Sequence, residues 1–496
     1  MQTDAIFSRC PIPLARGLSP PVYGWRCALC ATVLMVASLC SPIPAEAQDR
    51  VTINRANEVI GITVEGERVR KLIGDVSLRT EEMTMFCDSA YQYLEKNEVR
   101  AFGNIEINTE EENIYADTLI YFTDVDFSQL RGRVIIEADS ATIFSRAVDY
   151  RFSTKVGHFL EQVRLEDPDG TLVANTGFYY REPDSAVFRG QVQLADTLQY
   201  VEGDSLFINR RSEEYNLYGD VFLDDRENNV VLKGDSLKAD STGRRLLEGN
   251  AWLKRFEADT ADTAQADTTH IRSRIIHSIR TTTETDTATV INAYHSVRIW
   301  SPKFSAVSDT ARYESQTETF ELTSDPKAWH DSIQLTGPYI KVRLKDEEID
   351  ELESYPSPFV VQQDTAIDRL NQVKGDTLIA NFTEGEISRI HVFPNGRLLR
   401  YTKNDNDEPD GAVDLSSPSI LIFFIDGELV EMKAEGPVDG SYLPESQKTS
   451  ERRLDGFTWN PEQRPGEPEE AMRRRFPPIP DERPFEFPRR YLEKLR

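Results

Sequence analysis

The side chains that most often carry chemistry do not gather into a reactive pattern in this sequence. Asp followed by Ser or Thr recurs at Asp88-Ser89, Asp117-Thr118, Asp204-Ser205 and Asp309-Thr310. A hydroxyl beside a carboxylate invites comparison with an activated nucleophile, but that chemistry needs a neighbouring base, and no His recurs beside these pairs. We therefore interpret the pairs as residues of turns and strand starts.

Metal ligands are not indicated by spacing either. The six histidines are His158, His270, His277, His295, His330 and His391. They do not show the close pairing typical of metal sites, so we predict ordinary surface or sheet positions, no metal and no cofactor. Asp259, Asp262 and Asp267 are interpreted as a solvated loop. Cys87, the one cysteine after residue 47, is predicted to be a small buried side chain. These observations favour a protein that is not an enzyme.

Composition excludes further classes of protein. The chain has 496 residues with 57 Lys and Arg against 84 Asp and Glu, a formal charge of −27. A nucleic-acid-binding protein needs a basic surface, so no nucleic-acid partner is expected. The apolar fraction of 39% is enough for a folded core and too small for a polytopic membrane protein.

The first 47 residues have the features of a secretory signal. Arg16 and Arg26 precede the apolar run Cys27–Leu39, and Ala45-Glu46-Ala47 supplies a small-residue cleavage site. Such a signal would direct the chain to the periplasm and would be cleaved near Ala47. The exported protein could also associate with the outer membrane. The alternative is an uncleaved N-terminal anchor.

The rest of the chain is built from a short repeated pattern that predicts β-strands. The pattern Gly, any residue, apolar, any residue, apolar begins at residues 74, 103, 132, 161, 190 and 219, each 29 residues after the one before, and returns near 249, 295 and 324. Glu161, His295 and Ser324 take the place of glycine in three of these copies. An Asp-Ser or Asp-Thr pair follows most starts by about half a period, so each repeat holds two strands. Alternation gives one apolar face and one mostly polar face. Stacked repeats then predict an all-β solenoid of two facing antiparallel sheets with the apolar faces between them.

The pattern defines four regions. Residues 1–47 are the predicted signal peptide, and 48–345 are the repeat array. Residues 346–443 are a second β-rich region with strand–turn–strand segments at Lys345–Ile349, Phe382–Ile387 and Phe424–Leu429. Residues 444–496 are rich in Pro, Arg and Glu and are interpreted as a tail or linker, with a short helix considered near Glu467–Arg475.

The segments Arg70–Val76, Met85–Tyr91, Asn97–Asn108 and Tyr115–Tyr121 resemble the OstA-like family, which includes LptA-type periplasmic proteins of lipopolysaccharide transport. The resemblance covers about residues 50–345, and residues 375–443 resemble the C-terminal part of longer members. It implies an elongated β-jellyroll, or β-taco, whose V-shaped interior shields lipid acyl chains. It also implies a bridge from an inner-membrane transporter to an outer-membrane translocon. This chain is far longer than a single-domain bridge protein.

An apolar groove between the sheets would be lined by residues of the inward phase. The candidate lipid-binding residues are Val76, Leu78, Val99, Ile105, Ile107, Val134, Ile136, Val163, Leu165, Val192, Leu194, Val221 and Leu223. Covering about ten methylenes would offset roughly 8 kcal/mol of exposure to water, enough to hold a lipid without catalysis. The alternative for the same residues is a dry packed core.

Two functions are therefore expected from the sequence. The first is a non-catalytic periplasmic carrier of lipopolysaccharide or a similar lipid, working in outer-membrane assembly. Its terminal strands would pair with edge strands of other transport proteins, namely the inner-membrane complex and the outer-membrane translocon, unless the array caps its own ends. The second is a structural or adhesive exported β-solenoid with a packed interior and no ligand.

Overall fold

The computed structural model describes residues 51–494 except 139–140, 257–267, 283–286, 346–347, 407, 426–427, 446–451, 470–471 and 488. The predicted signal peptide and the acidic loop with Asp259, Asp262 and Asp267 lie outside the described residues. The chain forms two compact units: unit 1 contains the residues up to Pro183 together with Pro480–Arg496, and unit 2 contains Asp184–Ile479. Among the described helices, none has the length and apolar character needed to cross a bilayer.

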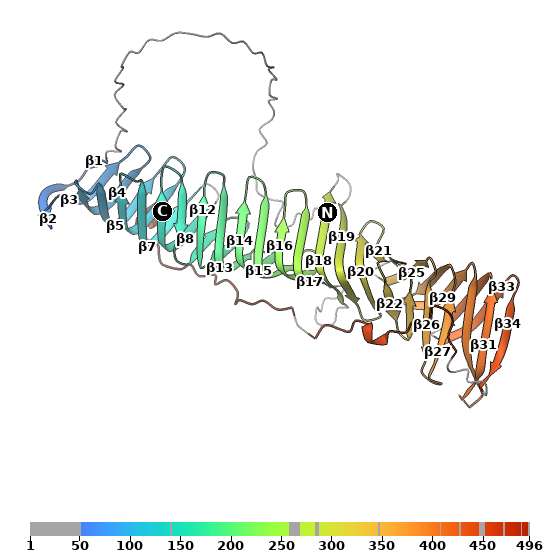
Figure 1. The fold of residues 1–496 in the computed structure, drawn as a ribbon. Coiled ribbons are helices and arrows are strands. Elements are labelled where there is room, and N and C mark those ends of the chain that lie inside the picture. Colours follow the sequence, from blue (N-terminus) through green and yellow to red (C-terminus); the bar gives the residue numbers. More distant parts are fainter. Residues whose placement is uncertain are drawn as a thin grey trace, which may run out of the picture. The chain divides into compact units, whose positions relative to one another are not determined.

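Both units are built almost entirely from antiparallel strands, which lie side by side within each unit (Figure 1), so the predicted all-β class is confirmed. Unit 1 contains β1 (Thr52–Arg55), β2 (Glu58–Val64), β3 (Glu67–Arg79), β4 (Thr84–Tyr93), β5 (Glu98–Asn108), β6 (Asn113–Phe122), β7 (Phe127–Glu137), β8 (Thr142–Arg151), β9 (Val156–Phe159), β10 (Val163–Glu166), β11 (Thr171–Ala174), β12 (Thr176–Tyr180) and the helix α1 (Arg489–Lys494). Unit 2 contains β13 (Ser185–Ala195), β14 (Gln199–Asn209), β15 (Glu214–Asp225), β16 (Val230–Ala239), β17 (Arg244–Phe256), β18 (Thr268–Thr282), β19 (Thr287–Trp300), β20 (Phe304–Glu314), β21 (Thr319–Thr323), β22 (Lys327–His330), β23 (Ile333–Thr336), β24 (Tyr339–Lys345), β25 (Glu348–Tyr355), β26 (Phe359–Asp364), β27 (Arg369–Lys374), β28 (Thr377–Thr383), β29 (Glu386–Phe393), β30 (Gly396–Lys403), β31 (Pro409–Ser417), β32 (Ser419–Ile425), β33 (Glu428–Glu435), β34 (Asp439–Pro444) and the short helix η3 (Pro461–Gln463).

The repeated glycine marks a corner inside β3, β5, β7, β13, β15 and β17. In β5 the pairing with β6 shifts between Phe102 and Ile105, and Gly103 in this bulge has a φ of +78°. A Cβ on Gly103 would also stand 2.5 Å from the Asp88 Oδ2 atom, so only glycine fits both the backbone and the space. The Asp88 carboxylate accepts a hydrogen bond from Asn104 Nδ2 at 2.7 Å.

The Asp-Ser and Asp-Thr pairs are therefore partners of these glycine corners. Asp88 lies in the interior of β4, and Asp117 accepts hydrogen bonds from Arg133 at the corner of β7. The sequence-based prediction that the pairs occupy turns and strand starts is wrong for these two. A carboxylate at the corner of one strand fills the space left by the missing side chain on the next, which explains why both elements recur in each repeat.

The corners divide the long strands into two layers. Glu98–Phe102 of β5 pairs with Thr118–Phe122 of β6 in the first layer, and Ile105–Asn108 pairs with Asn113–Ala116 in the second layer. Side chains from both halves of β5 are buried between the layers, namely Val99, Ala101, Ile105 and Ile107. The prediction that the apolar face forms the interior is thus confirmed. The two layers are joined at the corners, and the hairpin turns lie on the opposite side, which we call the hairpin side.

Beyond β20 the two layers are made from separate hairpins. The hairpins β24–β25, β28–β29 and β32–β33 pair successively in the first layer. The hairpins β22–β23, β26–β27 and β30–β31 do so in the second layer. The three strand–turn–strand segments predicted around residues 345–429 coincide with the first-layer hairpins and are confirmed.

The outer face of the second layer is less polar than the sequence pattern predicts. In unit 1, Tyr115 and Phe144 alternate with the inward-facing residues of their strands and therefore lie on the outer face, yet both are buried. The C-terminal segment covers them with Phe485, Phe487 and Tyr491 of the same unit. The rings of Tyr115 and Tyr491 meet edge to face with centroids 5.1 Å apart. The expectation of a mostly polar outer face is therefore wrong here.

The same segment covers the outer face in unit 2. Met472 packs against Tyr200, Phe222 and Val231, and Leu454, Phe457 and Trp459 pack against the cluster around Phe359 and Leu399. The region after residue 444 is thus a strap on the sheet surface rather than a simple tail or linker. Its described residues within 467–475 form no helix, and α1 is the α-helix found among the strap residues that the structure describes.

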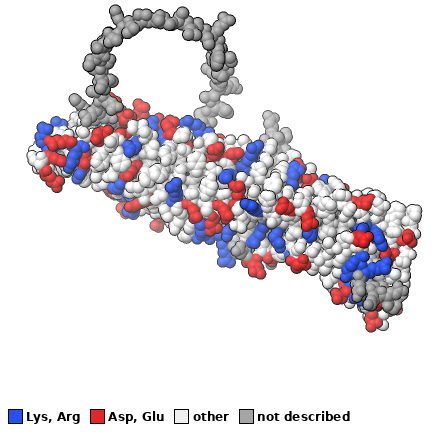
Figure 2. Space-filling view, in the orientation of Figure 1, with Lys and Arg blue, Asp and Glu red and all other residues white. Residues whose placement is uncertain are grey.

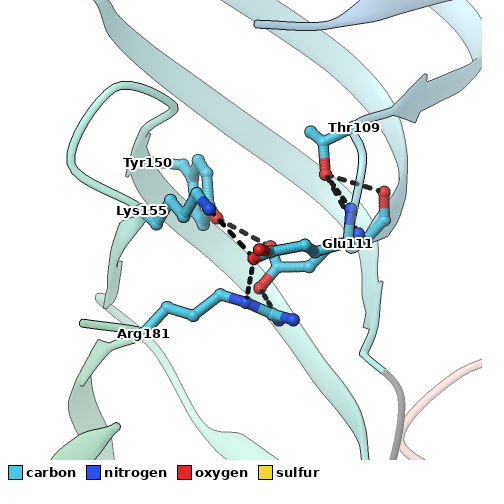
Figure 3. Close-up of polar contacts among 6 residues, drawn as sticks. Thr109, Glu111, Tyr150, Lys155 and Arg181 are labelled. Atoms are coloured by element: carbon cyan, nitrogen blue, oxygen red, sulfur yellow. Dashed lines mark hydrogen bonds and ion pairs between the residues drawn. The ribbon is translucent and has the colours of Figure 1, made fainter. Parts of the chain in front are cut away.

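Charged side chains join the two layers of unit 1 on the hairpin side (Figure 3). Glu112, in the β5–β6 turn of the second layer, accepts hydrogen bonds from Tyr150 Oη at 2.7 Å and from Arg181 Nη1 at 2.6 Å. The neighbouring Glu111 pairs with Arg181 Nε at 2.6 Å and with Lys155 Nζ at 3.0 Å. Burial, reinforced by Glu112, raises the pKa of Tyr150, and the bond from Lys155 lowers the pKa of Glu111. We call these five residues the unit 1 latch.

We expect Arg181→Met to destabilise unit 1 by about 3 kcal/mol, because it leaves the buried Glu112 carboxylate without its charge partner. Urea denaturation, with hydrogen exchange of β5–β8 as the local readout, measures the effect. Lys155→Met is the matched control and should cost less than about 1 kcal/mol, since its ion pair with Glu111 is exposed to solvent. Equal losses in both variants would show that the latch does not hold the layers together.

Candidate functional site

A cavity of about 340 Å³ lies between the two layers of unit 2. Its walls come from β15 to β20 and from the ends of β21 and β24, so both layers contribute. The apolar part of the lining includes Leu223, Leu232, Leu247, Leu253, Ile271 and Ile276. These are the residue types that cover hydrocarbon, and their side chains offer no group for acid, base or nucleophilic chemistry.

Strand alternation places charge on the hairpin side and apolar groups near the corners. In β17 the register shifts between Glu248 and Ala251, and Leu247 and Leu253 lie on either side of this corner. Moving two residues outward along each arm leads to Arg245 in the first layer and Arg255 in the second, and both line the cavity. In β18 the same step leads from Ile276 through Ser278 to Arg280 at the cavity.

The three arginines form a cationic rim, and the carboxylates of Asp225 and Glu227 act on Arg245. Arg245 Nη1 lies 3.6 Å from Asp225 Oδ2, which also lines the cavity and belongs to the second layer. Burial lowers the pKa of the Arg245 guanidinium; Asp225 opposes this, and the positive charge of Arg280 adds to the lowering. An arginine remains charged under these conditions, so the rim presents planar donors to an anionic group. The arrangement suits a molecule with an apolar tail and a negatively charged head.

The thirteen lining residues predicted from the sequence lie in the interior, but only one of them reaches this cavity. All except the half-buried Leu194 are 8% exposed or less. Leu223 lines the cavity. The residues from Val76 to Leu165 belong to unit 1, and Val192, Leu194 and Val221 belong to unit 2. The structure therefore brings Leu223 together with residues that the sequence reasoning missed.

The alternation of residues around Gly249 could have predicted the cavity-lining residues that the sequence reasoning missed. The repeat that begins at Gly249 was recognised, and continuing its alternation from Leu253 leads directly to Arg255. On the other side of the corner, Arg245 and Leu247 are two residues apart and therefore lie on the same, inward-facing side of the strand. The predicted list stopped at Leu223, before the repeat that begins one residue late and the long polar insertion that follows it.

Two other sequence predictions can be placed. Cys87 is fully buried, so the prediction of a small buried cysteine is confirmed, and burial raises the pKa of its thiol to about 12. His270 is also buried and accepts a hydrogen bond at Nδ1 from Trp252 Nε1 at 3.1 Å. The face shown in Figure 2 carries basic and acidic side chains intermingled rather than in single-sign areas.

Comparison with known proteins identifies the N-terminal part of the chain. No curated protein matches the sequence. Among solved structures, LptH from Pseudomonas aeruginosa, described as the LptA homologous periplasmic component of the lipopolysaccharide transport device, is 10% identical; the match covers 28% of this chain and 93% of that chain with a TM-score of 0.23. This likeness is too weak to assign a function. The family of OstA-like proteins matches residues 48–204, and this part of the chain therefore belongs to the OstA-like family.

Proposed function

We propose that this protein is a non-catalytic lipid carrier of the periplasm that holds the acyl chains of lipopolysaccharide or a similar lipid between its two layers. The observation that carries this proposal is the unit 2 cavity, which combines an apolar interior with a rim of Arg245, Arg255 and Arg280. Each methylene moved from water into such an interior gains about 0.8 kcal/mol, so a few acyl carbons suffice for binding. The arginines would bind the anionic head of the same molecule.

Lipopolysaccharide is favoured as the lipid by two further points. Residues 48–204 match the OstA-like family, and their motifs resemble those of periplasmic lipopolysaccharide-transport proteins. The signal-like segment that ends near Ala47 supports export to the periplasm. Lipopolysaccharide also has the chemistry that the cavity requires, since it combines several acyl chains with phosphate groups.

Edge strands support a role as a bridge between membranes. Among the described residues, β1 and β2 pair only with β3 in unit 1, and β33 and β34 pair only with β32 and β31 in unit 2. Val438 and Tyr442 near the last edge are about half exposed. Such edges leave backbone groups for strands of other transport proteins, in the inner-membrane complex and the outer-membrane translocon.

The predicted lining residues of unit 1 enter this proposal conditionally. Val76, Ile105 and Val134 are fully buried, so they would meet acyl chains only when the two layers separate on the hairpin side. Their burial also favours the second candidate function, a structural or adhesive exported β-solenoid with a dry interior. The two candidates differ in whether lipid enters the protein at all.

Filling the cavity distinguishes these candidates. We expect Ser278→Trp to reduce lipopolysaccharide binding at least tenfold, because the indole would occupy the space that an acyl chain needs. His277→Trp is the matched control, since the adjacent residue of β18 points to the opposite face and should leave binding unchanged. Titration of purified protein with labelled lipopolysaccharide measures the affinity. Wild-type protein that binds no lipid, or a Ser278→Trp variant that binds normally, would remove the carrier proposal for unit 2.

The arginine rim predicts a preference for anionic lipid. We expect Arg280→Gln to weaken binding of a phosphorylated lipid by about tenfold or more, the effect of losing one charge-assisted hydrogen bond. Binding of the same lipid without phosphate should change little. Arg274→Gln, at an exposed position of the same strand, is the control. An equal loss for both lipids would mean that Arg280 supports the fold rather than the head group.

A further inference from the structure

A second group of polar side chains lies on the hairpin side of unit 2, away from the cavity. His330 ends β22, and Asp331 follows it in the β22–β23 turn of the second layer. Glu386 begins β29 in the first layer, directly after the β28–β29 turn. One potential ligand atom from each of the three residues lies within 4.8 Å of the others. The group thus joins the two layers, as the latch does in unit 1.

The buried imidazole of His330 has an unsatisfied nitrogen directed at this group. The side chain is 7% exposed, and its Nε2 lies 3.1 Å from the carbonyl oxygen of Gly385. A carbonyl oxygen only accepts, so the Nε2–H donates and the neutral ring carries its lone pair on Nδ1. Among the residues that the structure describes, Nδ1 has no hydrogen-bond partner, although Asp331 Oδ2 lies 3.2 Å away. Two acceptors that face each other in this way are satisfied when a cation binds between them.

The neighbouring Lys303 shows that the carboxylates attract positive charge. Its Nζ lies 3.0 Å from a carboxylate oxygen of Glu386, and the side chain is half exposed on the β19–β20 turn. A lysine on a flexible stem can move into solvent when a stronger cation arrives. Its position means that a metal ion must compete with the ammonium group for Glu386.

The donor set determines which cation fits. One imidazole nitrogen and two carboxylates are typical ligands for a borderline divalent ion such as Zn²⁺, with water completing the coordination. Calcium and magnesium prefer oxygen ligands alone, so the imidazole disfavours them. The ligands are 56 residues apart in the sequence at their widest, between His330 and Glu386, and this is why histidine spacing does not reveal them.

We propose that His330, Asp331 and Glu386 form a binding site for a divalent transition metal, with Zn²⁺ as the favoured ion, and that the bound metal ties the two layers of unit 2 together. The ion would link the β22–β23 turn to the β28–β29 hairpin, which are otherwise joined at this point by the His330–Gly385 hydrogen bond. The inference stands independently of the proposed lipid function.

Calorimetric titration of the full chain with ZnCl₂ tests the site. We expect one ion per chain, at least tenfold weaker binding in His330→Gln and in Glu386→Gln, and unchanged binding in Asp350→Asn. Asp350 is a matched control, because it is a partly exposed carboxylate in an ion pair with Arg343. Equal affinity of the wild type and His330→Gln would overturn the proposal.

Lys303→Met gives a second, independent test that does not remove a ligand. We expect it to bind Zn²⁺ several-fold more tightly than the wild type, because the competing ammonium group is gone. Visible absorption of added Co²⁺ reports the ligand set, and the nitrogen ligand contributed by His330 should disappear from the spectrum of His330→Gln. Weaker or unchanged zinc affinity in Lys303→Met, or a Co²⁺ spectrum that is identical in all variants, would also overturn the proposal.

Discussion

The left-handed backbone at the strand corners, supplied by glycine in strands such as β5 and by His295 and Ser296 in β19, is the constraint on which the rest of the structure depends. A long strand can contribute to both layers only if its backbone turns sharply in the middle, and Gly103 with its positive φ shows how this is achieved. The carboxylate of Asp88 occupies the space that a side chain at Gly103 would need, so two adjacent strands bend together. Once the corners are aligned, inward-facing residues of both halves must share one interior.

That geometry separates the apolar from the charged parts of the interior. Residues next to the corner, such as Leu247 and Leu253, are enclosed by both layers, whereas residues two positions farther out approach solvent on the hairpin side. In unit 1 these outer positions and the adjoining turns hold Glu112 and Arg181, which bond across the layers. In unit 2 the corresponding positions hold the arginines of the cavity rim. The same architecture thus provides a closed edge in one unit and a charged entrance in the other.

Much of this fold could be predicted from the sequence. The 29-residue period gives the positions of the corners, and the alternation of apolar and polar residues along each strand shows which side chains face the interior. The repeat that begins with Glu161 has no glycine, and its strand is broken into β9 and β10. In β19, which also lacks the glycine, His295 and Ser296 adopt positive φ values and the strand is continuous. Contacts between distant segments could not be predicted. Tyr115 and Phe144 interrupt the polar outer phase, but nothing local indicates that Phe487 and Tyr491 cover them. The cavity likewise depends on how far the layers are separated near β17, which periodicity does not encode.

The strap gives unit 1 an unusual order of assembly. Its residues up to Pro183 emerge from the ribosome long before residues 480–496, and all of unit 2 is made in between. Until residues 480–496 have been made, the aromatic side chains of Tyr115 and Phe144 lack the cover that Phe485, Phe487 and Tyr491 provide. Residues 480–496 follow unit 2 in the sequence, so unit 1 completes the burial of these aromatic side chains only after the whole of unit 2 has been made.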